Sequence, residues 1–236
     1  MAKKTDRSTP DRFEGFADRE ARFFKALAKH QDREWFAAHR DEYDAGWLEP
    51  MKALLAELRE KLAPRYAREE LAAPKVFRIH RDVRFSKDKA PYKTHIGGYL
   101  GIEGSGAGPG GAAALYVHVA PDELFACAGQ YMMDGEQLKR FRAAVVDAKR
   151  GAEVAGILRP LLRAGFEVGS HEQLQRVPRG FDPEHPQADL LRRKGLMVAF
   201  PTPDRTLLTS RKLVDWLAGH AKKSVPLVEW LAAVTV

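Results

Sequence analysis

The chain has 236 residues, of which 44% are hydrophobic and 30% are charged, with 39 Lys and Arg against 32 Asp and Glu and a single cysteine. This apolar share suffices for a hydrophobic core, whereas no apolar run reaches the roughly 20 residues of a membrane-spanning helix. One cysteine, Cys127, excludes an internal disulfide and a zinc site made of thiolates. A single unpaired cysteine is typical of proteins in a reducing compartment, so we expect a cytoplasmic protein.

The first twelve residues are polar and basic, with four basic and two acidic side chains, and no apolar signal core follows them. We expect residues 1–12 to form a disordered basic tail. No repeat or evident linker divides the remainder, so residues 13–236 are expected to form one α+β domain.

Three helices are predicted in the first quarter of the chain. The first follows Asp18, the second begins after the favourable N-cap residue Asp32, and the third starts near Pro50. The apolar residues of the third helix recur at helical spacing, at Met51, Leu54, Leu55, Leu58 and Leu62.

After Pro74 the apolar period changes to two, which predicts a strand over residues 77–86. Further strands are expected at 95–102, 115–119 and 124–128, and their short connections favour antiparallel pairing. The glycine-rich stretch 104–111 reads as a loop between two of them.

The second half returns to helices around 138–145, 154–162 and 213–231, with strands at 166–168 and 196–200. Pro160 is expected to kink or restart its helix. The predicted fold class is therefore α+β, with a mainly antiparallel sheet packed with N-terminal and C-terminal helices.

Residues 75–95 hold most of the net charge, because seven Lys and Arg and two Asp give +5 of the total +7. In a strand, Arg78, His80, Asp82 and Arg84 would line one face at a spacing of about 7 Å. Such a row could bind an anion between guanidinium groups, with His80 exchanging a proton near neutral pH.

We therefore predict a site for a small phosphorylated or carboxylated ligand, with His80 and Asp82 as an acid–base pair if the protein is an enzyme. The expected ligand-binding residues are Arg78, Arg81, Arg84, Ser86, Lys87, Lys89, Tyr92, Lys93, Arg176 and Arg179. No cofactor and no metal are expected, because His80, Asp82 and His118 lack a compact ligand spacing.

Two other interpretations remain open. The same basic segment, with Tyr92 and the N-terminal tail, could bind nucleic acid through phosphates, although the rest of the chain sums to zero charge. Alternatively, Arg81, Asp82 and Arg84 could form buried ion pairs that join the sheet to the first helices. No membrane partner is expected, and the sequence leaves the oligomeric state and the question of catalysis open.

Residues 81–93 (RDVRFSKDKAPYK) resemble the signature of the domain of unknown function 2461 family of bacterial and fungal proteins. Residues 33–36 (REWF), 116–119 (YVHV) and 176–181 (RVPRGF) agree with it, and the similarity runs from about Phe13 to Leu196. The family commonly has asparagine where this chain has Gln31-Asp32. The resemblance implies a single soluble domain with a functional centre at the signature, and it implies no particular reaction.

Overall fold

Six strands form one antiparallel sheet in the computed structural model, which describes residues 12–84, 86–105 and 111–236. Their order across the sheet is β1-β2-β3-β4-β6-β5. The strands are β1 Lys75–Val76, β2 Ile96–Gly101, β3 Ala113–Val119, β4 Leu124–Gln130, β5 Glu167–Gly169 and β6 Leu196–Ala199. With helices before and after it, this sheet confirms the predicted α+β class.

Helices precede the sheet, follow it and connect its last strands. The helices are α1 Arg22–Lys29, α2 Arg33–Ala38, α3 Arg40–Tyr43, α4 Glu49–Leu62, α5 Gly135–Val146, α6 Ala148–Arg163, α7 Ala188–Arg192 and α8 Lys212–Thr235. Shorter helical turns are η1 Asp44–Leu48, η2 Ala63–Arg65 and η4 Arg205–Thr209.

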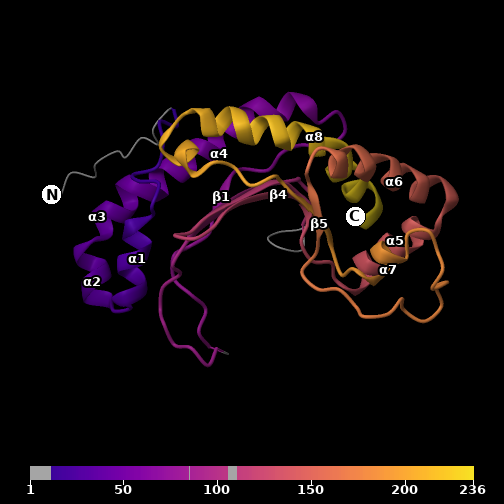
Figure 1. The fold of residues 1–236 in the computed structure, drawn as a ribbon, viewed down its shortest axis with the longest axis horizontal. Coiled ribbons are helices and arrows are strands. Elements are labelled where there is room, and N and C mark those ends of the chain that lie inside the picture. The colour runs from indigo at the N-terminus through magenta and orange to yellow at the C-terminus, as the bar shows by residue number, and fades with distance from the viewer. Residues whose placement is uncertain (1–11, 85, 106–110) are drawn as a thin grey trace.

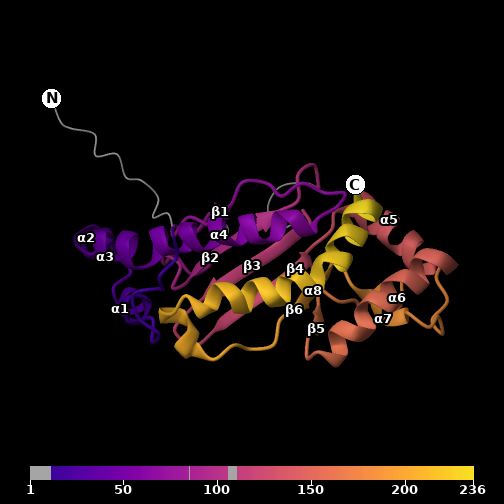
Figure 2. The same ribbon diagram turned by 90° about the horizontal axis from the view of Figure 1, so that it is seen from above.

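The helices cover one face of the sheet and flank its two ends (Figure 1). On the covered face, α4 contacts β1 and β2, while α8 contacts β3 and β4. Seen from above, these two helices run over the strands (Figure 2). The helices α1–α3 lie at one end and α5–α7 at the other, so the opposite face carries none of the described helices (Figure 1).

Burial along β3 follows this division between the two faces. Leu115, Val117 and Val119 are fully buried toward the helices, whereas Tyr116 and His118 are only partly buried. Successive side chains of a strand point to opposite faces. The open face therefore receives Tyr116 and His118.

Local sequence signals account for the helix boundaries. Asp32 caps α2, since its Oδ1 accepts a 2.7 Å hydrogen bond from the Trp35 backbone N–H. Asp134 caps α5 in a capping box with Gln137. Pro160 lies within the last turn of α6, and the helix runs through it without restarting there.

The apolar stripe predicted for the third helix is buried in α4. All five of its members, Met51, Leu54, Leu55, Leu58 and Leu62, are 0% exposed. Burial of this stripe against the sheet and α8 provides the main stabilisation of the helix, because helix formation alone is marginal in water.

The strand predicted over residues 77–86 is not part of the sheet, and this prediction is wrong. Pairing of β1 with β2 ends at Val76, after which the Phe77 N–H donates one further hydrogen bond of 2.9 Å to the Gly97 carbonyl. The chain then leaves the sheet on its open side and returns to β2 as an arm, residues 77–93 (Figure 1).

The arm is held by pairing between its own two sides. The Arg81 N–H donates to the Pro91 carbonyl and the Lys93 N–H donates to the Ile79 carbonyl, each at 2.8 Å. An extended segment shows a period of two whether it pairs with a sheet or with itself. The sequence pattern therefore predicted the extended backbone correctly, but it wrongly predicted that this segment pairs with the sheet.

Tyr92 anchors the arm to the first helices. Its side chain is 4% exposed, and its ring stacks on Phe36 with the centroids 4.5 Å apart. Its backbone N–H donates a 3.0 Å hydrogen bond to Gln31 Oε1. The arm is thus fixed at its base near α1 and α2.

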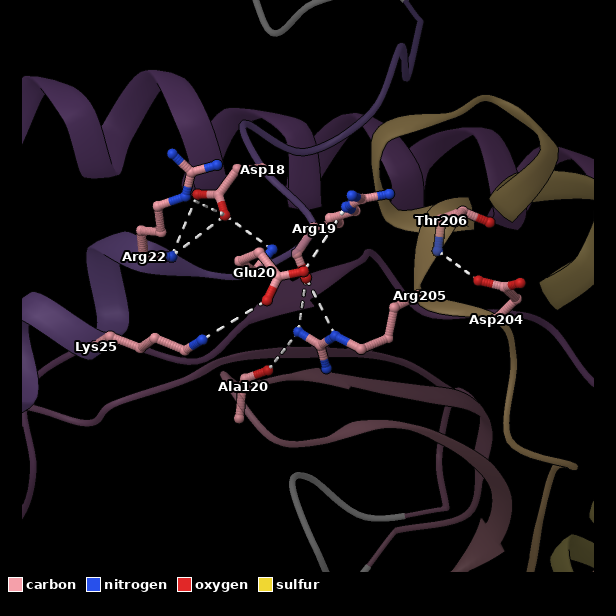
Figure 3. Close-up of polar contacts among 9 residues, drawn as sticks. All are labelled: Asp18, Arg19, Glu20, Arg22, Lys25, Ala120, Asp204, Arg205 and Thr206. Atoms are coloured by element: carbon pink, nitrogen blue, oxygen red, sulfur yellow. Dashed lines mark hydrogen bonds and ion pairs between the residues drawn. The ribbon is translucent and has the colours of Figure 1, made fainter.

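Arg205 joins three segments that are distant in the chain (Figure 3). Its Nε and Nη2 donate to the Arg19 carbonyl at 3.1 and 2.9 Å, and Nη2 also donates to the Ala120 carbonyl at 3.0 Å. A planar guanidinium has enough fixed donors to serve two carbonyls together. This one side chain connects the segment before α1, the turn after β3 and the start of η4.

Two sequence predictions fall largely outside the described residues. These are the basic tail, of which only Arg12 is described, and the glycine-rich loop, of which residues 106–110 are not.

Across the described parts of the chain, no helix combines the length and the apolar character that crossing a membrane requires.

Candidate functional site

Most of the sequence-predicted site residues lie on the arm, where several pair with one another. Arg84 donates from Nε and Nη2 to the two carboxylate oxygens of Asp82, at 3.0 and 2.7 Å. Arg81 pairs through Nη1 with Asp88 and donates to the Ala90 carbonyl at 3.2 Å. Hydrogen bonds from Arg84 lower the pKa of Asp82, and those from the Ala90 N–H and then Arg81 lower the pKa of Asp88.

These ion pairs differ from the arrangement predicted from the sequence, in which Arg78, His80, Asp82 and Arg84 line one face of a strand. The Arg84 and Asp82 side chains are 77% and 43% exposed, so they form no buried network between the sheet and the first helices. His80 is exposed as well, and no contact joins it to Asp82 among the described residues. The acid–base pair of His80 and Asp82 stays a prediction.

The remaining polar residues near the arm tip maintain its shape. The Ser86 N–H donates to the Val83 carbonyl at 3.3 Å, and Lys89 Nζ donates to the same carbonyl at 2.9 Å. Lys87 is exposed. The tip is therefore held by one backbone hydrogen bond and by the Lys89 side chain, and Lys87 adds an exposed positive charge.

Arg78 and Lys93 differ from the other arm cations. Among the described residues neither forms a hydrogen bond or an ion pair with a carboxylate, although the Arg78 charge helps to lower the pKa of Asp82. Lys93 Nζ lies 5.3 Å from the centroid of the Phe77 ring. Partial burial and then the Arg78 charge lower the pKa of Lys93. Two neighbouring cations without an ion-pair partner favour the binding of an anion.

The structure does not bring Arg176 and Arg179 to these cations. Both are exposed, on the segment between β5 and α7. That segment lies at the α5–α7 end of the molecule, whereas the arm leaves the sheet nearer α1–α3 (Figure 1). Arg176 and Arg179 therefore lie apart from the other residues expected to bind the ligand.

The open face of the sheet contains a pocket of about 350 Å³. Its aromatic lining consists of Phe77, Tyr99, Tyr116, Phe125 and Tyr131. These residues come from the base of the arm, from β2, β3 and β4, and from just after β4. Small-molecule sites typically have this size and this aromatic character.

Three polar groups adjoin one another in the pocket. Tyr116 Oη lies 3.0 Å from His118 Nδ1, and His118 Nε2 lies 3.6 Å from Glu123 Oε2. Burial raises the pKa of Tyr116 to about 12, so the hydroxyl keeps its proton, and burial lowers the pKa of His118. The arrangement that satisfies all three groups has Tyr116 donating to Nδ1 and the Nε2–H facing Glu123.

A second imidazole lies against the first. The His95 and His118 rings have centroids 4.3 Å apart. Burial, and then the nearby His118 and Lys93, lower the pKa of His95 to about 4, while Glu123 acts in the opposite direction. Both imidazoles are therefore neutral hydrogen-bonding groups near pH 7.

Cys127 also lines the pocket, and its thiol is unreactive. It is buried, and burial raises the pKa of its thiol to about 12. A nucleophilic cysteine needs an accessible thiolate. In the part of the chain that the structure describes, no three His, Cys, Asp or Glu side chains are grouped to hold a metal ion.

The pocket was not predicted from the sequence. Tyr116 and His118 were available as alternate residues of one strand, but Tyr99 and Phe125 reach the same face only through strand register. Tyr99 pairs with Tyr116, and His118 pairs with Phe125. The hydrophobic pattern of each strand does not determine such pairings, since neighbouring strands could pair in several registers.

A comparison with known protein families matches residues 20–230 to the family described as "Conserved hypothetical protein (DUF2461)". The chain belongs to this family. No curated protein and no solved structure matches the chain. The DUF2461 resemblance stated from the sequence is thereby confirmed, and the family description assigns no activity.

Two of the DUF2461-like segments meet in this fold. The signature at residues 81–93 forms most of the arm, and the YVHV segment supplies Tyr116 and His118 of the pocket. Lys93, the last residue of the signature, lies over Phe77, which lines that pocket. Segments that are separate in the sequence thus contribute to one surface.

We expect the stability of this protein to depend on the protonation of His95. The pKa in the folded state, about 4, lies below the ordinary 6.5, so the unfolded chain binds the proton more readily. This contribution is fully present above about pH 6.5 and is lost as the pH falls toward 4. It amounts to about 1–2 kcal/mol, because water screens a partly exposed group.

Urea unfolding of the wild type and of His95→Gln at pH 7 and pH 4.5 checks this expectation. Glutamine does not titrate, so the wild type should lose about 1–2 kcal/mol more than the variant across this interval. Equal losses in the two proteins would contradict the depressed pKa. The difference between the two proteins removes the contributions of carboxylates that titrate in both.

Proposed function

We propose that this protein binds a small anionic ligand whose planar, largely apolar body occupies the pocket and whose anionic group contacts Arg78 and Lys93. One observation carries the proposal. Phe77 lines the pocket and also lies beneath the Lys93 ammonium group. Aromatic surface and unpaired positive charge therefore adjoin at one rim of the pocket.

The ligand class is the one expected from the sequence, but the centre of the site moves from the arm tip to the arm base. At the tip, the Arg84–Asp82 and Arg81–Asp88 pairs already partly satisfy the arginines. At the base, an anion would gain two cations without displacing a carboxylate. Lys93 is partly buried, and charge interactions strengthen where water is partly excluded.

The protonation states favour hydrogen bonding to a ligand over attack by a nucleophile of the protein. The Tyr116 hydroxyl and the Cys127 thiol have raised pKa values, and His118 of the pocket and the adjoining His95 have lowered ones. These neutral groups can donate and accept hydrogen bonds to a bound molecule. Nucleophilic attack would instead need an activated, deprotonated group.

Two fluorescent dyes test the proposal. Anilinonaphthalene sulfonate carries an aromatic body and an anionic group, and N-phenyl-naphthylamine is its uncharged counterpart. Combining Arg78→Met with Lys93→Met should raise the Kd of the sulfonate dye about tenfold and leave that of the uncharged dye unchanged. Tyr99→Ala should weaken both dyes, because it removes part of the aromatic wall.

The matched control is Lys222→Met, which removes an exposed lysine on α8, on the covered side of the sheet. It should change neither affinity. Near-ultraviolet circular dichroism verifies that each variant is folded. The proposed role of the cations would be refuted if the double substitution weakened the binding of both dyes equally. It would also be refuted if the Kd of the sulfonate dye did not change.

A further inference from the structure

We infer that the ligand is a nucleotide, with its nucleobase in the aromatic pocket and its phosphate at Arg78 and Lys93. The inference rests on the proposed function and names the chemical class that the same site recognises. It follows from three features of the pocket: the hydrogen-bonding groups in it, the orientation of its rings, and the type of cations at its rim.

The hydrogen-bonding groups match the edge of a base. The Glu123 carboxylate accepts hydrogen bonds only, while His118 and Tyr116 present ring nitrogen and hydroxyl groups beside it. A nucleobase edge carries donors and acceptors next to one another in the same way. The Glu123 carboxylate, whose 3.6 Å approach to His118 is too long for a hydrogen bond, can accept one from an exocyclic amine.

The aromatic rings supply faces for a planar body. Phe77 and Tyr99 stack with centroids 5.4 Å apart and planes at 29°, and Tyr116 and Phe125 lie with centroids 6.3 Å apart. Stacking of a base on such side chains contributes about 1–3 kcal/mol per base in other proteins. A saturated hydrocarbon chain would use the apolar area but would leave the polar edge without a hydrogen-bonding partner.

The cations suit a phosphate. Arg78 offers a planar fork that matches two phosphate oxygens, and Lys93 offers a compact point charge. Neither forms an ion pair among the residues that the structure describes. The pocket, at about 350 Å³, is at the small end of the range for ligand sites and fits one nucleotide better than a polymer.

Isothermal titration calorimetry of the 236-residue chain tests this inference with two matched pairs of ligands. Adenosine and inosine monophosphate differ by an amine against a carbonyl at the base edge, and so do cytidine and uridine monophosphate. We expect the amine-bearing member of at least one pair to bind about tenfold tighter, and ribose phosphate to bind more weakly than either member. Glu123→Gln should abolish the preference, because an amide can also donate to a carbonyl.

Glu60→Gln, an exposed change on α4, is the matched control and should preserve the preference. Equal affinity for both members of each pair would overturn the inference. Binding of oligouridine without binding of any mononucleotide would overturn it in favour of a nucleic-acid surface. Absence of nucleotide binding, with sulfonate-dye binding that still depends on Lys93, would overturn the nucleotide and leave the proposed function standing.

Discussion

We expect Gly129→Ala to lower the free energy of unfolding by about 3 kcal/mol or more. Gly129 lies in the middle of the sheet, where β4 pairs with β6, and its φ is +124°, which side chains rarely adopt. A Cβ there would lie 2.4 Å from the Leu196 carbonyl oxygen and 2.7 Å from the Met197 Cα. Because both obstacles are backbone atoms, relief requires the two strands to separate. Urea unfolding measures the effect.

Gly156→Ala makes the same chemical change where the structure predicts the opposite sign. Gly156 is exposed within α6, and a Cβ there meets no atom within 4 Å. Alanine should therefore stabilise the helix by about 0.5–1 kcal/mol. If Gly129→Ala were tolerated as well as Gly156→Ala, the close approach of β4 and β6 at this position would be contradicted.

We expect Arg205→Ala to lower the free energy of unfolding by about 2 kcal/mol. The substitution leaves the Arg19 and Ala120 carbonyls without the donors they have in Figure 3. It also separates the segment before α1 from the turn after β3. Arg205→Lys should recover only part of the loss, because an ammonium group lacks the planar fork. Chemical unfolding at pH 7 compares the three proteins.

Arg22→Ala is the matched control for this prediction. Its side chain is 80% exposed and lies 4.0 Å from Asp18, a geometry that contributes little to stability. Its loss should change the free energy of unfolding by no more than about 0.5 kcal/mol. Equal effects of Arg205→Ala and Arg22→Ala would show that the carbonyl contacts of Arg205 are unimportant.

Local signals in the sequence predicted the elements of this fold more accurately than their partners. The cap at Asp32 and the stripe of α4 depend on residues within one helix, so they were readable. The strands β2, β3 and β4 followed from alternation and turn residues. The arm was misassigned because self-pairing and sheet pairing share the same period, and only the long-range contacts of Tyr92 and Gly97 distinguish them.

The candidate site was predicted less completely, for the same physical reason. Composition located the cations, and one of them, Lys93, lies over Phe77 of the pocket, with Arg78 near enough to lower its pKa. Ion pairing of Asp82 with Arg84 was one of the open alternatives, but the sequence could not show that this pair is exposed rather than buried between the sheet and the first helices. Nor could it place Tyr99 opposite Tyr116, which depends on strand register.

The position of α8 in the chain has a consequence for synthesis on the ribosome. This helix covers β3 and β4 and packs on α4, α5 and α6, yet it emerges after all of them. Just before it, Arg211 pairs with Glu57 at 2.7 Å across 154 positions. The apolar side of β3 and β4 therefore stays uncovered in the nascent chain until α8 is translated, and exposed strands of this kind are prone to aggregation.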